Sequence, residues 1–179
     1  MKFWITVSKA IDATNETVGR AVLWLVGAAT LISALNALAR YGLGRSSNAW
    51  LEIQWYLFGA IILRAAGYTL KHNGHVRVDV IYGHCSARAQ AWIDLLGALL
   101  FLLPLCGLMV WLALPAFIDS FQSGEMSPDA GGLVRWPVRL LIVLGFALLG
   151  LQGVAEIIKR IAFLRGARKL SREQPQGQV

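Results

Sequence analysis

The residues best able to do chemistry lie in one polar stretch, LKHNGHVRVDV, at positions 70–80. The types and spacing of four residues in and just after this stretch would suit a set of metal ligands: His72, His75, Asp79 and His84. Two features argue against such a site. Gly74 interrupts the helix that would align the two histidines, and Lys71 and Arg77 would repel a cation. We therefore predict no metal and no cofactor, and the sequence shows no Ser/His/Asp set or glycine-rich phosphate loop.

The elements that must position this stretch are membrane helices. Hydrophobic residues make up 56% of the 179 residues and charged residues 15%, and the apolar residues come in long blocks. A soluble domain of this composition would expose too much apolar surface. The net charge of +7 comes from basic residues at the ends of the blocks, where they favour contacts with membrane lipids rather than nucleic acid.

Four apolar blocks are long enough to cross a bilayer, which takes about 20 helical residues. They run at about 18–38, 50–68, 91–118 and 138–158. Backbone groups in lipid must be satisfied internally, so these blocks predict an all-α membrane protein with four transmembrane helices, in a domain at 18–165. Pro104 and Pro115 predict kinks in the third helix.

The two ends of the chain differ from this domain. In residues 1–17 apolar side chains recur at helical spacing opposite charged ones, which predicts an amphipathic helix in the membrane interface. Residues 166–179 form a basic tail that we expect to be disordered and cytoplasmic. Twelve of the seventeen Lys and Arg residues fall in segments on the same side as the termini, and four on the other. Both termini are therefore predicted to be cytoplasmic.

Charged residues inside or beside the spans are candidate structural or partner-contact sites, since charges in a membrane usually face protein. Arg64 lies about six residues from the inner end of the second helix. Asp94 and Glu156 are expected at a similar depth, so Arg64 should pair with one of them, and the sequence leaves open which. Glu52 lies near the outer end of the second helix. The outer connection at 119–137 carries Glu125 and Arg135, and it is either a solvated connector or a docking surface.

Small residues on two helices predict close helix contacts. The fourth helix has Gly145, Gly150 and Gly153 beside Gln152, and the first has a run of small residues that begins at Gly27. The sequence leaves open whether these faces pack within the chain or against another subunit.

Two longer stretches resemble a known family. The run LEIQWYLFGAIILRAAGYTLKHNGHVRVDVIY (51–82) resembles the small membrane subunit of tripartite ATP-independent periplasmic (TRAP) transporters, the DctQ-type family. The positions that carry the likeness are Glu52, Gln54, Trp55, His75, Val76, Arg77 and Asp79. SGEMSPDAGGLVRWPVRLLIVLGFALLGLQGVAEIIKR (123–160) resembles the end of the same family.

The resemblance implies a role in transport. Members have four helices and bind a large membrane subunit that carries the substrate and sodium, while a periplasmic binding protein delivers the substrate, typically an organic acid. It implies a protein of the bacterial inner membrane that is not an enzyme and acts as a scaffold for the transport subunit. The alternatives are a membrane-bound metal-binding or enzyme accessory subunit, and a small autonomous channel.

The resemblance also changes the interpretation of the opening stretch. It becomes a cytoplasmic connector at the membrane edge, in which Arg77 and Asp79 fix a turn or a partner contact.

Overall fold

The computed structural model of the chain describes residues 2–44, 47–75 and 82–166, and within these ranges the fold is entirely helical, with no β-sheet. The long helices are α1 (Lys2–Gly42), α2 (Asn48–Lys71), α5 (Leu103–Ser123) and α6 (Trp136–Leu164). The shorter α4 (Ala87–Gly97) and a π-helical segment, η1 (Ala98–Leu102), lead directly into α5. This confirms the predicted all-α fold.

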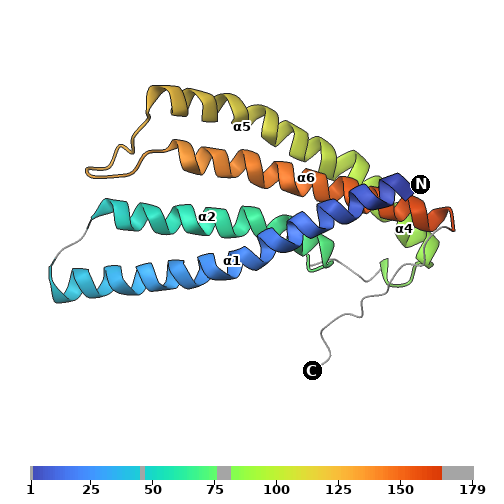
Figure 1. Ribbon diagram of the computed structural model, residues 1–179, viewed down its shortest axis with the longest axis horizontal. Helices are drawn as coiled ribbons and strands as arrows, with labels where there is room; N and C mark the ends of the chain where they lie inside the picture. The colour runs from blue at the N-terminus through green and yellow to red at the C-terminus, as the bar shows by residue number, and fades with distance from the viewer. Residues whose placement is uncertain (1, 45–46, 76–81, 167–179) are drawn as a thin grey trace.

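The long helices lie side by side in the order α1, α2, α6, α5, as Figure 1 shows. The first turns of α1, α4 and the last turns of α6 share one end of the bundle, which we call the terminal end. At the other end, the connector end, α1 leads into α2 and residues 124–135 join α5 to α6. Near the terminal end α1 crosses α6, and towards the connector end α2 lies between them.

Three helical stretches are long and apolar enough to cross a membrane: Phe3–Gly42, Ala87–Ser123 and Trp136–Leu164. They contain the predicted spans at 18–38, 91–118 and 138–158. The predicted span at 50–68 lies within α2, which is 24 residues long but carries Glu52, Arg64 and Lys71 and does not reach the same standard of apolarity. The chain is therefore a multi-pass membrane protein, and a fourth crossing by α2 stays a prediction.

The N-terminal segment differs in form from the expectation. We expected an interface helix at 1–17 and a separate first span, whereas α1 runs for 41 residues without a break. Ser8 and Asn15 in this segment are each 1% exposed, so it packs into the bundle. Its placement in the membrane interface stays a prediction.

The third apolar block forms one helical column from Ala87 to Ser123 with an irregular middle. In η1 the backbone N–H of Leu103 reaches the carbonyl of Ala98, one residue further back than in an α-helix. Pro104 follows at once, and proline has no N–H to donate. The π-helical turn is therefore the local irregularity at the first of the two prolines where kinks were predicted.

The glycines of α6 pack within the chain. A Cβ added at Gly145 would lie 2.6 Å from Cβ of Leu63 in α2, and one at Gly153 would lie 2.8 Å from Cδ2 of Leu102 in η1. At Gly150 the nearest atom would be Cβ of Cys106 in α5, at 3.3 Å. Gly27 in α1, by contrast, has open space beside it. The sequence left open whether the small residues of α6 pack within the chain or against another subunit. These three glycines allow α2, η1 and α5 of the same chain to pack closely on α6.

Candidate functional site

At the connector end, one face of α2 binds the loop between α5 and α6. The side chains of Asn48, Glu52 and Tyr56 are four residues apart, so they follow one helix face. Glu52 is 7% exposed, and its Oε2 accepts a hydrogen bond of 2.6 Å from the backbone N–H of Leu133. Its Oε1 accepts from the hydroxyl of Ser127. The buried carboxylate of Glu52 thus fixes both sides of the loop.

The two neighbours of Glu52 bind loop carbonyls. Nδ2 of Asn48 donates to the carbonyl of Ala130 at 3.0 Å, and the hydroxyl of Tyr56 donates to that of Val134 at 2.9 Å. Contacts at three successive turns of α2 therefore hold residues 127–134 against this helix.

The loop also folds back on itself, which places two of the predicted residues. The backbone N–H of Arg135 donates to the carbonyl of Glu125 at 2.9 Å, and the carboxylate of Glu125 pairs with Arg139 at 2.7 Å. Gly131 permits a tight turn in this loop with φ of +72°, a value that side chains disfavour. The structure therefore brings Glu52, Glu125 and Arg135 to one end of the molecule.

The two residues beside Glu52 in the resemblance do not join this contact. Trp55 lies on a different face of α2 and is 71% exposed. Gln54 is half-buried. A role for either residue in binding a partner stays a prediction.

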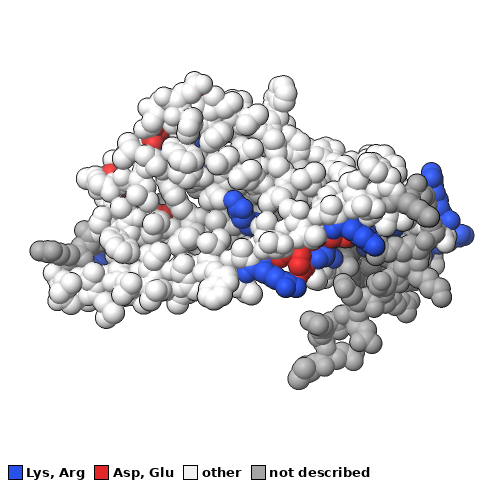
Figure 2. Space-filling model, viewed as in Figure 1, with Lys and Arg blue, Asp and Glu red and all other residues white. Residues whose placement is uncertain are grey.

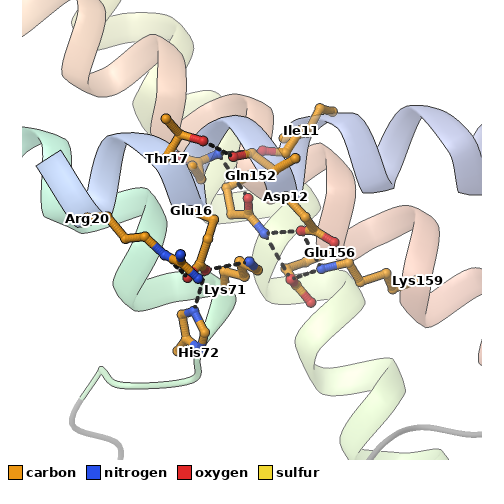
Figure 3. A network of polar contacts seen from close by, with 12 residues as sticks. Ile11, Asp12, Glu16, Thr17, Arg20, Lys71, His72, Gln152, Glu156 and Lys159 are labelled. Atoms are coloured by element: carbon orange, nitrogen blue, oxygen red, sulfur yellow. Dashed lines mark hydrogen bonds and ion pairs between the residues drawn. The ribbon is translucent and has the colours of Figure 1, made fainter.

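At the terminal end, a buried polar cluster joins α1 to α6 (Figure 3). Gln152 is fully buried, and its Oε1 accepts a hydrogen bond of 2.9 Å from Nδ2 of Asn15. Its Nε2 donates to Oδ1 of Asp12 at 2.9 Å and to Oε1 of Glu156 at 3.1 Å. Lys159 lies 2.7 Å from both carboxylates and compensates their charge. Amide, carboxylate and ammonium groups thus bind one another between two helices far apart in sequence, while Oδ1 of Asn15 is buried without a hydrogen-bond partner among the described residues.

A second group in Figure 3 joins α1 to α2 through Glu16. Its Oε2 lies 2.7 Å from Nζ of Lys71 and 3.0 Å from Nε2 of His72, while Oε1 lies 3.1 Å from Nε of Arg20. The His72 ring also packs against Tyr68, with the ring centroids 4.3 Å apart. His72, a candidate metal ligand on sequence grounds, contacts α1 and its own helix instead.

The predicted pairing of Arg64 is wrong. Asp94 pairs with Arg160 at 3.2 Å, and Tyr82 donates a hydrogen bond of 2.9 Å to the same carboxylate. Glu156 pairs with Lys159, three residues further along its own helix. Arg64 forms no hydrogen bond or ion pair with any part of the chain that the structure describes. The sequence expectation assumed that Arg64, Asp94 and Glu156 lie at a similar depth in the membrane. In the structure, Arg160 and Lys159 of α6 pair with the two acids instead.

Arg77 and Asp79 lie outside the described residues, so their proposed role in a turn or a partner contact stays a prediction. The stretch just before them is described. Helix α2 ends at Lys71, Asn73 adopts a left-handed conformation with φ of 51°, and the N–H of Gly74 donates to the carbonyl of Thr69 at 2.9 Å. The helix therefore stops where the sequence predicted.

Of the four candidate metal ligands, Asp79 lies outside the described residues. Across residues 2–44, 47–75 and 82–166, no three His, Cys, Asp or Glu side chains gather closely enough to hold a metal ion.

Sequence reasoning missed the side chains that join α1 to α6 and to α2. The charged residues at 1–17 were expected on the polar face of an interface helix, yet Asp12 pairs with Lys159 of α6 and Glu16 pairs with Lys71 of α2. One signal was available: Asn15 follows Ile11 by four residues and so continues the apolar row of residues 3, 7 and 11. A polar side chain on an apolar row needs a buried partner.

Comparison with known proteins gives one match. Residues 29–163 match the family described as tripartite ATP-independent periplasmic transporters, DctQ component. No curated protein and no solved structure matches the chain. The family match covers about three quarters of the chain, from the middle of α1 almost to the end of α6, and it includes Glu52 and Gln152 but not Asp12, Asn15 or Glu16.

Proposed function

The chain belongs to the DctQ component family of tripartite ATP-independent periplasmic transporters and is a small membrane subunit of such a transporter; from this premise we propose that it is a non-catalytic scaffold for the large transport subunit. The transported solute is an organic acid or a similar compound, and a periplasmic binding protein delivers it.

The observation that supports a scaffold is that this chain joins its own helices at both ends. At the terminal end the side chains of Asn15 and Gln152 tie α1 to α6. At the connector end Glu52 ties α2 to the loop before α6. Buried polar groups that hydrogen-bond between helices make an arrangement of helices specific. A stationary support for a moving transport domain needs this property.

The apolar outer surface supports a large contact with lipid and with another membrane subunit. Tryptophans on two separate helices are strongly exposed: Trp24 on α1 at 83% and Trp111 on α5 at 77%. Large exposed apolar surfaces mark contact with lipid or with a partner protein.

The proposed orientation places the terminal end in the cytoplasm. On the face shown in Figure 2, basic side chains gather towards this end, whereas the connector end is mostly white. An excess of Lys and Arg is typical of the cytoplasmic side. The loop at 124–135 then faces the periplasm, where the binding protein docks.

Reconstitution of transport tests the scaffold. The large subunit, this chain and the binding protein are placed in liposomes, together and with each one omitted. We expect solute uptake only with all three, and co-purification of this chain with the large subunit. Full uptake without this chain would contradict a scaffold, and flux in liposomes that hold this chain alone would favour a channel.

A further inference from the structure

Arg64 lies in the inner half of α2, about two turns before its end at Lys71, on the side of the helix that faces α1. Two neighbours one turn away on the same side are buried: Ala60, which is 7% exposed, and Gly67. A Cβ at Gly67 would collide with the side chain of Asn15, so α1 covers this side of α2 at its inner part. Arg64 is half-buried, which leaves part of its side chain accessible.

The large exposed side chains of α2 lie on another side of the helix. Trp55, Phe58 and Ile62 are 71%, 51% and 69% exposed and follow one another at spacings of three and four residues. At 100° per residue, Arg64 is rotated about 160° from Ile62. The face suited to lipid chains is therefore nearly opposite to the one that carries Arg64.

Lys71, on the same side of α2 as Arg64, is a cation that has an ion-pair partner on α1. It lies seven residues after Arg64, about 10 Å further along the helix axis, and pairs with Glu16 of α1 at 2.7 Å. Arg64 has no corresponding partner among the described residues.

The sequence of the packed helices explains why. At this depth Leu63 packs on Gly145 of α6, and Tyr68 packs on Gly19 of α1. After Glu16, α1 contains no Asp or Glu up to its end at Gly42. Likewise α6 contains none before Glu156, which pairs with Lys159. The two helices that flank α2 therefore offer Arg64 no counter-charge.

An unpaired arginine at membrane depth is unfavourable, and such residues usually pair with another protein group. We propose that Arg64 forms an ion pair with an Asp or Glu carboxylate on a membrane helix of the large subunit. That helix packs on α2 beyond the point where α1 crosses α6, where α1 and α6 diverge (Figure 1). This inference rests on the proposed function. The planar guanidinium can bind a carboxylate through two parallel hydrogen bonds, which fixes the register of the two helices.

A carboxylate of the large subunit fits better than a lipid phosphate. The side of α2 that carries Arg64 faces protein, since α1 covers it at Gly67. The large exposed apolar side chains of α2, which suit contact with lipid, lie almost opposite. The assembly therefore brings a protein helix onto this face beside α1.

The test compares three variants co-expressed with the large subunit: Arg64→Gln, Arg64→Lys and Arg20→Gln. We expect Arg64→Gln to lower the amount of co-purified large subunit about tenfold, and Arg64→Lys to lower it less, because Lys keeps the charge but loses the paired hydrogen bonds. Arg20→Gln is the matched control, because Arg20 is 77% exposed and its surface pair with Glu16 contributes little.

The isolated chain separates assembly from folding. Arg64→Gln should leave its melting temperature in detergent unchanged, since the side chain has no partner among the described residues. A lower melting temperature of the isolated Arg64→Gln chain, compared with the isolated wild-type chain, would overturn the proposal in favour of a structural role for Arg64.

A charge exchange identifies the partner residue. In the Arg64→Glu background, each membrane-embedded Asp and Glu of the large subunit is replaced in turn by Arg. One replacement should restore co-purification, and failure of all of them would overturn the carboxylate pair. Normal assembly of Arg64→Gln with loss of a bound anionic phospholipid in native mass spectrometry would assign the contact to lipid instead. If the wild-type chain itself fails to co-purify, the proposed function is wrong before any variant is compared.

Discussion

At the connector end a carboxylate on α2 accepts hydrogen bonds from a backbone N–H and a hydroxyl of a loop, whereas at the terminal end side chains of α1, α2 and α6 bind one another. Glu52 and its neighbours Asn48 and Tyr56 all contact residues 127–134. Gln152 instead bonds to three side chains, two of them on α1 and one on α6. The connector end therefore positions a loop, and the terminal end positions helices.

This difference predicts how each end responds to change. A lost contact at the connector end should free the loop locally, because water can reach exposed neighbours such as Asn48. A lost contact at the terminal end leaves buried polar groups unsatisfied and should weaken the whole bundle. The expected effects below run from the largest to the smallest.

Replacement of Gln152 by Leu should have the largest effect. It removes the acceptor of Asn15 on α6, so that Nδ2 of Asn15 keeps only the carbonyl of Ile11 in its own helix. It also removes the amide donor that Asp12 and Glu156 share. We expect a loss of about 3 kcal/mol in the free energy of unfolding. Unfolding in detergent measures it, with the exposed Gln122→Leu on α5 as the control. Equal stabilities of the two variants would contradict a special role for the terminal end.

Replacement of Gly67 by Ala tests the same end through packing. The added methyl group collides with the side-chain amide of Asn15, so that side chain must move and strain its hydrogen bond to Gln152, or α1 and α2 must separate. We expect destabilisation by about 2 kcal/mol, as for other overpacked sites. In Gly59→Ala, on the same helix, the methyl group meets open space and stability should be unchanged or slightly higher. If both variants behave alike, close contact at Gly67 is not needed.

Replacement of Glu52 by Ala should act on the loop alone. The N–H of Leu133 and the hydroxyl of Ser127 lose their acceptor. We expect amide hydrogen exchange at residues 127–134 to become about tenfold faster, with no change in α1. Ser127→Ala should give a smaller increase, because the bond to Leu133 remains. Faster exchange throughout α1 and α6 would show that the connector end also positions helices.

Replacement of Arg139 by Gln should have the smallest effect. Arg139 and Glu125 are each 31% exposed, so water screens their ion pair. We expect a change of about 0.5 kcal/mol in the free energy of unfolding and little change in loop exchange. A loss as large as that of Gln152→Leu would erase the distinction between the ends.

The sequence predicted elements well and partners poorly. Three apolar blocks lie inside helices, since hydrophobic length depends only on local composition. The helices around 91–118 and 138–158 end close to the predicted limits, whereas α1 begins well before the predicted start at 18. Glu52 was placed near the end of its helix, but its acceptor role could not be predicted, because the donor is a backbone N–H 81 residues away. Arg64 was expected to pair with Asp94 or Glu156, yet each acid proved to have a cation on α6.

By itself the sequence determined a helical membrane protein, the location of its long apolar stretches, and a family likeness that the comparison confirmed. These follow from composition, hydrophobic length and short motifs, which are properties of neighbouring residues. Only the tertiary structure decided that Asn15 meets Gln152, that Glu52 holds a loop and that Arg64 has no counter-charge among the residues that the structure describes. Such pairings depend on the rotation and crossing of whole helices, and these are fixed by packing among all of them together.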